Sequence, residues 1–314
     1  MEMKKITLIG IGAMGVFFAP KLETGLPKGD FRVLAGGARK ARLEADGVTI
    51  NGAIHRFTVI TPEKTGDPAD LVIMAVKDTG LEQAISDIKN QVGAHTQILC
   101  VMNGVDSEER VAAVYGWEHV LYSYMRVSIN MHDGVANFDP KMGKVHFGEA
   151  KNSQISDRVR QISVLFDACG IHYEVDEDMM KGLWFKFMCN VGENLTCALL
   201  DIPFGAYRIS EHANVLRREA MWEVVRLANK LGIELGQAEM DWQEAHIKRI
   251  TFFNKPSTLL DMEAGRKTEV EMFAGKVVSL GKQLGVETPL NWMFYHAIKV
   301  REEKNIGLFD HESV

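Results

Sequence analysis

The sequence predicts an α/β protein: an N-terminal, doubly wound and mostly parallel sheet, followed by a second domain that is all helical. Short apolar runs alternate with helical patterns over the first half, and a glycine-rich turn follows the first of these runs. After about Tyr173 the chain becomes strongly helical. Repeated strand–helix–strand units produce a parallel sheet with helices on both faces. We therefore predict a dinucleotide-binding domain over 1–174 and a helical substrate domain over 175–314.

Strands of the first domain are predicted from four apolar runs, at residues 5–9, 31–35, 71–76 and 98–102. The last two are continuous, which is typical of strands covered on both faces. Helical spacing links Leu81, Ile85, Ile88 and Val92. Asn51-Gly52 predicts a two-residue hairpin turn within residues 48–60.

Two amphipathic helices are predicted in the second domain. The first is indicated by Val215, Leu216, Trp222, Val225 and Leu231, with Gly232 placed to end it. The second runs from about Thr268 to Leu284 and is closed by Gly285.

The glycine-rich turn reads Gly10-Ile-Gly12-Ala13-Met14-Gly15 and lies between the first strand and an apolar helical stretch. In that context Gly10 permits a tight turn, Gly12 lets the backbone approach a pyrophosphate, and Gly15 allows close packing of helix on strand. The N–H groups at the helix start would bind the anion. The turn therefore predicts a Rossmann-like dinucleotide site.

The segment after the second predicted strand bears on which nicotinamide cofactor is bound. It reads Ala35-Gly-Gly-Ala-Arg39-Lys40, with Arg42 beyond and no carboxylate before Glu44. An acidic residue here would select NAD, whereas arginine suits the 2′-phosphate of NADPH. We favour NADPH and Arg39 as a ligand; the competing interpretation is a solvated basic helix start.

Lys186, Asn190 and Asn194 lie four residues apart, so on a helix they project from one face amid bulky apolar residues. Two interpretations are open: a solvated helix face, or a cleft in which the amides position a substrate and the lysine donates a proton. Reduction of a ketone needs a hydride at carbon and a proton at oxygen, and a desolvated ammonium can supply that proton. Lys181 is the weaker candidate.

Composition excludes several other classes of function. A net charge of −6 offers no basic field for nucleic acid. No apolar run is long enough to span a bilayer, and glycines interrupt the N-terminal apolar stretch, so we expect a cytoplasmic protein. No metal is expected, because the histidines show no ligand spacing. The cysteines are expected to be buried and free; they are Cys100, Cys169, Cys189 and Cys197.

The sequence resembles the ketopantoate reductase family over nearly its whole length. The resemblance rests on five short elements in order: the Gly10–Gly15 turn, Val76-Lys77, Asn103-Gly104, the Lys186–Asn194 segment with its Leu-Thr-Cys-Ala-Leu continuation, and Ser257 with Asp261 followed by Glu269.

The resemblance implies NADPH-dependent reduction of a small 2-oxo acid, with 2-dehydropantoate (ketopantoate) reduced to pantoate in pantothenate and coenzyme A biosynthesis. Lys186 would be the general acid, and Glu269 would lie near it and the cofactor ribose. Substrate would be held by Asn190, Asn194 and Ser257. Besides the glycine turn with Ala13 and Met14, cofactor would be contacted by Lys77 and Asn103 near the nicotinamide.

Three departures from the family pattern leave another 2-oxo acid open. Gly36 stands where the family usually carries arginine, Leu195 follows Asn194 where it has proline, and Phe204 replaces a polar residue of some members. The alternatives are a 3-hydroxyacid dehydrogenase and a non-catalytic NADPH-binding regulator. Four bulky residues of the helical domain, Trp222, Met240, Trp242 and Trp292, would support a homodimer, although core positions are the preferred interpretation.

Overall fold

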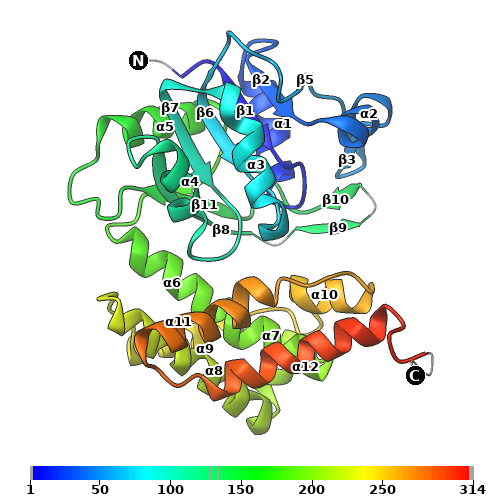
Figure 1. The fold of residues 1–314 in the computed structure, drawn as a ribbon, viewed down its shortest axis with the longest axis vertical. Coiled ribbons are helices and arrows are strands. Elements are labelled where there is room, and N and C mark those ends of the chain that lie inside the picture. The colour runs from blue at the N-terminus through cyan, green and yellow to red at the C-terminus, as the bar shows by residue number, and fades with distance from the viewer. Residues whose placement is uncertain (1–2, 128, 133, 311–314) are drawn as a thin grey trace. The chain divides into compact units, whose positions relative to one another are not determined.

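The computed structural model describes residues 3–127, 129–132 and 134–310. The chain divides into two compact units, residues 1–180 and 181–314. Figure 1 shows the first as a mixed α/β unit and the second as a set of helices.

Unit 1 is built on an eight-stranded sheet in the order β12-β11-β8-β7-β6-β1-β2-β5. Its strands are β1 (Ile6–Ile9), β2 (Phe31–Leu34), β5 (Val59–Ile60), β6 (Ala69–Met74), β7 (Val92–Cys100), β8 (Val120–Arg126), β11 (Lys144–Gly148) and β12 (Tyr173–Glu174). All neighbouring pairs are parallel except β8–β11. From β5 to β8 the order is the 3-2-1-4-5-6 order of a Rossmann sheet, which confirms the predicted fold class.

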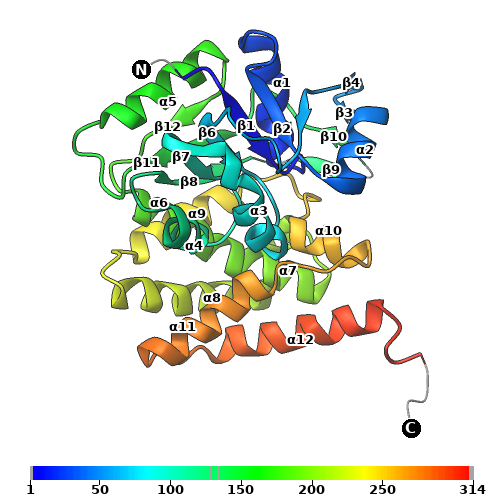
Figure 2. The same cartoon turned by 45° about the horizontal axis from the view of Figure 1, so that its top comes forward.

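Helices cover both faces of this sheet (Figures 1 and 2). On one face, α1 (Gly15–Gly25) and α5 (Asp157–Ala168) contribute Phe17 and Phe166 to a large apolar core. On the other, α3 (Leu81–Asp87) and α4 (Ser107–Tyr115) contribute Ile85 and Val111 to a second core. The strands between are therefore buried from both sides, as their continuous apolar sequences predict.

The predicted hairpin turn is confirmed. Asn51 and Gly52 both have positive φ, 49° and 83°, and they join antiparallel strands β3 (Val48–Ile50) and β4 (Ala53–His55). The hairpin belongs to a four-stranded sheet of unit 1 in the order β4-β3-β10-β9, completed by β10 (Val135–Asn137) and β9 (Asn130–His132).

Unit 2 is helical throughout its described residues apart from connecting turns (Figure 2). It begins within α6 (Met179–Cys189), which continues as the π-helix η3 (Asn190–Asn194) and then α7 (Leu195–Leu200). The remaining elements are η4 (Phe204–Arg208), α8 (Glu211–Lys230), α9 (Gln237–Ile247), α10 (Ser257–Glu263), the π-helix η5 (Glu271–Gly275), α11 (Lys276–Leu284) and α12 (Pro289–Asn305). Within this unit α8 packs on η3, and α10 packs on α7 and η3.

Several local predictions were wrong. Val92 begins β7 instead of ending a helix, because the helical spacing stops at α3 and a short 3₁₀ turn, η2 (Ile88–Gln91). Val215 of α8 and Leu231, which caps its end, are exposed, while Arg217 and Glu223 of α8 are buried. The helix predicted from Thr268 begins at Glu271. Gly285 does close it, with φ 65°.

The chain's cysteines are free and buried, as predicted. Trp242 and Trp292 are 51% and 54% exposed, so the core position preferred for them is wrong; Met240 is buried. Among the described residues, no helix has both the length and the apolar character that a membrane span requires.

Candidate active site

The predicted cofactor residues all follow the carboxyl ends of adjacent strands in unit 1. The glycine turn follows β1, Arg39 follows β2, Lys77 follows β6 and Asn103 follows β7. The register brings these ends together, because Ile9 is paired with both Leu34 and Met74, and Met74 with Cys100. Ligands of open α/β sheets bind outside the carboxyl ends of the strands where the strand order reverses. Here that position is next to β1.

Each glycine of the turn has a distinct structural reason. Gly10 has φ 93°, and a Cβ there would lie 2.6 Å from the carbonyl carbon of Ala75. A Cβ on Gly15 would overlap the Gly10 carbonyl oxygen. Around Gly12, by contrast, a Cβ would meet nothing within 4 Å. Fold constraints therefore explain Gly10 and Gly15, whereas Gly12 leaves open space in which a pyrophosphate fits.

The segment after β2 is exposed. Gly36 is the N-cap of α2 (Gly37–Ala45) in an extended conformation, with φ −118° and ψ 169°. Arg39 and Arg42 are exposed on this helix, and Lys40 pairs with Glu44. The two arginines are therefore available to an anionic ligand.

The loop after β6 is anchored through its acidic residue. Lys77 is exposed and precedes the 3₁₀ turn η1 (Asp78–Gly80). Arg110 of α4 pairs with Asp78 and with Glu82, each at 2.7 Å. The bridge links α4 to the turn that directly follows Lys77.

In unit 2, the lysine and the two asparagines lie on α6 and η3 instead of on one continuous α-helix. Lys186 and Asn190 are half-buried, and Asn194 is 8% exposed. The Asn194 amide donates to Asn190 Oδ1 over 3.5 Å. The prediction of a single helix is therefore wrong at Asn190, where the backbone widens into a π-helix. Such segments are frequent at functional sites.

The two remaining predicted residues are carried by neighbouring elements of unit 2. Ser257 is exposed and is the first residue of α10, whose N-cap is Pro256. Glu269 is half-buried and precedes η5, which contacts η3. Its neighbour Thr268 donates through both N–H and Oγ1 to Glu302 of α12, over 2.7 and 2.6 Å. Asp261, which lies four residues after Ser257, pairs with Arg266 at 2.8 Å.

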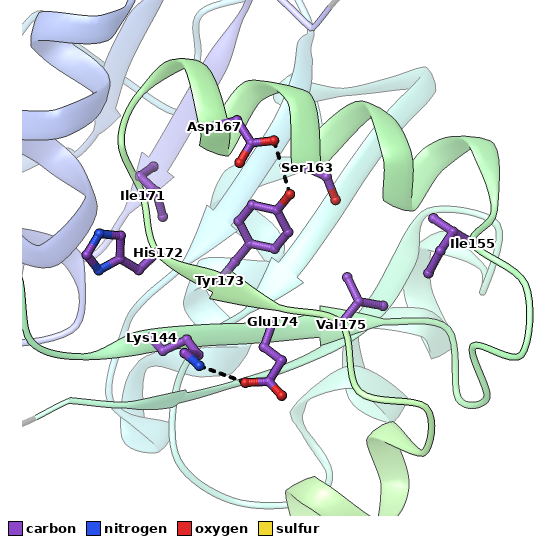
Figure 3. A pocket seen from close by; sticks show the side chains of 9 residues that line it. All are labelled: Lys144, Ile155, Ser163, Asp167, Ile171, His172, Tyr173, Glu174 and Val175. Carbon is purple, nitrogen blue, oxygen red and sulfur yellow. Dashed lines mark hydrogen bonds and ion pairs between the residues drawn. The ribbon is translucent and has the colours of Figure 1, made fainter.

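A hollow of 710 Å³ lies elsewhere in unit 1, between α5 and the β11–β12 edge (Figure 3). Figure 3 shows two pairs among its polar side chains: Lys144 with Glu174 at 2.8 Å, and Tyr173 with Asp167 at 3.2 Å. None of the predicted site residues lines it. It is therefore not part of the candidate site.

Among the described residues, His146, Glu174 and Asp176 have ligand atoms within 4.8 Å of one another. These atoms already have protein partners. Asp176 is hydrogen-bonded to His146 Nδ1 at 2.8 Å and accepts from the Tyr124 hydroxyl at 2.6 Å. Burial, followed by the Asp176 carboxylate, raises the pKa of Tyr124 well above its usual value. Hydrogen bonds within the protein therefore explain why these three side chains lie together.

Sequence reasoning missed several buried ionisable residues. Glu193 and Arg217 form an ion pair in unit 2 at 3.0 Å. In unit 1, Arg32 of β2 pairs with Asp67 at 2.6 Å. Glu108 of α4 is 1% exposed, and burial raises its pKa to about 7. No local sequence signal marks the two ion pairs, since their partners are 24 and 35 residues apart in the chain.

A Rossmann sheet with this glycine turn, followed by a helical unit, is an arrangement typical of nicotinamide-dependent oxidoreductases. Residues 6–152 match the family model described as ketopantoate reductase PanE/ApbA, and residues 178–302 match the model of its C-terminal part. The chain therefore belongs to the ketopantoate reductase family, which confirms the resemblance inferred from its motifs.

Individual relatives agree with this assignment. The chain is 25% identical over 265 residues to the 2-dehydropantoate 2-reductase of Streptococcus pyogenes serotype M6, covering 83% of this chain and 86% of that one. It is 24% identical over 312 residues to the enzyme of the same name from Aquifex aeolicus, covering 96% and 98%.

Solved structures share the fold. D-mandelate dehydrogenase with NADH and anilino(oxo)acetate superposes with a TM-score of 0.84 at 20% identity, over 96% of this chain and 99% of that one. A ketopantoate reductase of Ralstonia eutropha JMP134 gives 0.81 at 21% identity, with the same coverage.

Proposed function

We propose that the protein reduces 2-dehydropantoate to pantoate with NADPH, as a step of pantothenate biosynthesis. The observation that supports this most directly is the alignment of four predicted cofactor segments at the carboxyl ends of β2, β1, β6 and β7. NADPH, when bound, supplies the hydride that becomes attached to the keto carbon.

Unit 1 supplies the cofactor site in this proposal. The open space at Gly12 accommodates the pyrophosphate beside the start of α1. Arg39 contacts the 2′-phosphate through charge-assisted hydrogen bonds. Lys77 and Asn103 contact the cofactor near the nicotinamide.

Unit 2 supplies the acid and the substrate contacts. Lys186 donates a proton to the keto oxygen as negative charge develops there. Asn190, Asn194 and Ser257 donate hydrogen bonds to the substrate carboxylate and hydroxyl, and we assign to Glu269 the role of a partner for the lysine and the cofactor ribose.

The first test follows the loss of nicotinamide absorbance with purified protein and ketopantoate, in parallel with NADPH and NADH. We expect rapid oxidation of NADPH and slow oxidation of NADH. Turnover with NADH alone would contradict the assignment of Arg39. Absence of turnover across a panel of 2-oxo acids, with tight NADPH binding, would favour the non-catalytic regulator instead.

The proton donor is tested by Lys186→Ala, which we expect to lower kcat by about 10²–10⁴. Lys181→Ala is the matched control: it removes a lysine of the same helix, which pairs with Glu239 at 2.7 Å. Equal losses of kcat in the two variants would remove Lys186 from the mechanism.

A second candidate substrate is another 2-oxo acid, such as phenylglyoxylate. It is favoured by the fold shared with D-mandelate dehydrogenase and by Phe204, which stands where some family members have a polar residue. The ratio of kcat/KM for ketopantoate and phenylglyoxylate decides between the two. If kcat/KM for ketopantoate is lower than for phenylglyoxylate, the protein is still a 2-oxo acid reductase but ketopantoate is not its preferred substrate.

We also propose a homodimer. One solved relative, from Staphylococcus aureus, is described as dimeric. In unit 2, Trp242 and Trp292 are about half exposed. Light scattering after size-exclusion chromatography should give twice the mass of one chain, and a monomer at micromolar concentration would refute the proposal.

A further inference from the structure

A buried ionic network lies directly behind η3. Glu193 of η3 is 4% exposed and Arg217 of α8 is 1% exposed, and they are paired at 3.0 Å. Gln243 of α9 donates to both carboxylate oxygens of Glu193, over 2.9 and 2.8 Å. Arg217 also pairs with Glu244 of α9. Two separate helices therefore hold one carboxylate of the π-helix.

The backbone of η3 is held by the same neighbours. The buried Tyr207 hydroxyl donates to the carbonyl oxygen of Glu193 over 2.8 Å. The Arg217 guanidinium lies over the Tyr207 ring, 5.0 Å from its centroid. A Cβ on Gly192 would lie 2.7 Å from the Arg217 carbonyl oxygen, so only glycine lets α8 approach this closely.

A buried ion pair is a poor way to gain stability, since apolar residues of similar volume often serve as well or better. What the charged network adds is geometric definition, because each hydrogen bond has one direction and one partner. Here the directional contacts fix the position of Glu193, which lies between the two asparagines assigned to the substrate. The π-helix is a rare conformation, and these contacts fix its backbone.

We propose that Arg217 and Gln243 are positioning residues: acting through Glu193, they hold the backbone of η3 and thereby set the spacing of Asn190 and Asn194 against the substrate. This inference rests on the proposed function, which assigns those asparagines to a 2-oxo acid. Neither Arg217 nor Gln243 needs to touch the substrate.

The test variant is Glu193→Gln, which keeps the side-chain shape and leaves Arg217 its second partner, Glu244. An amide accepts at one oxygen only, so one of the two Gln243 contacts is lost. We expect KM for ketopantoate to rise by about 10- to 100-fold, the consequence of misplacing a substrate ligand by about 1 Å. NADPH affinity, set in unit 1, should stay within about twofold of the wild type.

The matched control is Glu223→Gln. Glu223 is 2% exposed and lies on α8 like Arg217, but its carboxylate caps α12 by accepting from the N–H groups of Leu290 and Asn291 over 2.8 and 2.9 Å. This variant should lose thermal stability without a change in KM. Equal effects of the two variants on KM, or no effect of Glu193→Gln, would overturn the inference.

Hydrogen exchange distinguishes this inference from the proposed function. Peptides that cover residues 190–194 should exchange faster in Glu193→Gln than in the wild type or in Glu223→Gln. Unchanged exchange there overturns the positioning role. A wild-type protein that reduces no 2-oxo acid would overturn the proposed function, whereas the exchange result would still decide whether the network holds η3.

Discussion

Two glycines of one turn should respond oppositely to the same substitution. Gly10 has φ 93°, and a Cβ there would lie 2.6 Å from both the carbonyl carbon and the carbonyl oxygen of Ala75. Gly12 has open space around it. Alanine at position 10 therefore tests whether the fold needs glycine there, and alanine at position 12 tests whether cofactor binding does.

The magnitudes follow from these surroundings. For Gly10→Ala, a strained backbone conformation costs about 1–3 kcal/mol, and overlap with a backbone that cannot swing aside costs about 1–3 kcal/mol more. For Gly12→Ala we expect a change within about 1 kcal/mol, with a small gain from restricting the unfolded chain. NADPH binding by Gly12→Ala should weaken at least about tenfold, or about 1.4 kcal/mol.

The assays are urea unfolding followed by far-ultraviolet circular dichroism, and NADPH titration by fluorescence. Gly10→Ala should lower the unfolding midpoint, whereas Gly12→Ala should keep the wild-type midpoint and lose affinity. Wild-type affinity in Gly12→Ala would show that no pyrophosphate approaches this turn. A wild-type midpoint in Gly10→Ala would refute the steric argument.

Three further predictions concern charged residues. Burial raises the pKa of Glu108 to about 7 from its usual 4.5. The contribution of this carboxyl to the free energy of unfolding is therefore fully present below about pH 4.5, and about 3 kcal/mol of it is lost as the pH rises through 7. Urea midpoints of Glu108→Gln should fall less than those of the wild type between pH 5.5 and 8, and parallel curves would contradict this. Arg217→Met leaves the Glu193 carboxylate uncompensated and should lose about 3–5 kcal/mol of unfolding free energy. The double variant with Glu193→Leu should recover most of that loss, and a double variant no more stable than Arg217→Met would refute the ionic coupling. Arg39→Ala should weaken NADPH binding about tenfold and leave NADH binding nearly unchanged; titrations showing equal loss for both cofactors would remove Arg39 from the 2′-phosphate.

The sequence was most informative where a local chemical rule determines the conformation. Asn51-Gly52 forms the predicted turn because both residues tolerate positive φ. The glycine turn after β1 likewise needs no remote partner to be recognised. Pairing of β3 with β10, in contrast, joins segments over 80 residues apart through contacts that no local pattern encodes.

Buried charges account for the error in the predicted core face of α8. Counting only apolar residues placed Val215 of α8 and Leu231, which follows it, in the core, whereas the buried face of α8 includes Arg217 and Glu223. Their partners lie in η3 and at the start of α12, and these contacts become visible only once the helices are packed. The π-helix was also missed: it packs on α8, and that contact joins segments that no local sequence pattern connects.

The extended conformation of Gly36 allows this residue after β2 to be replaced without rearranging the backbone. Its φ of −118° suits any L-amino acid, and the nearest atom to a Cβ built there is Pro62 Cδ at 3.7 Å. An arginine could therefore enter at this position by a single substitution without strain in the backbone. Discrimination between NADPH and NADH would then depend on the side chains that follow β2, while the glycine turn after β1 stays unaltered.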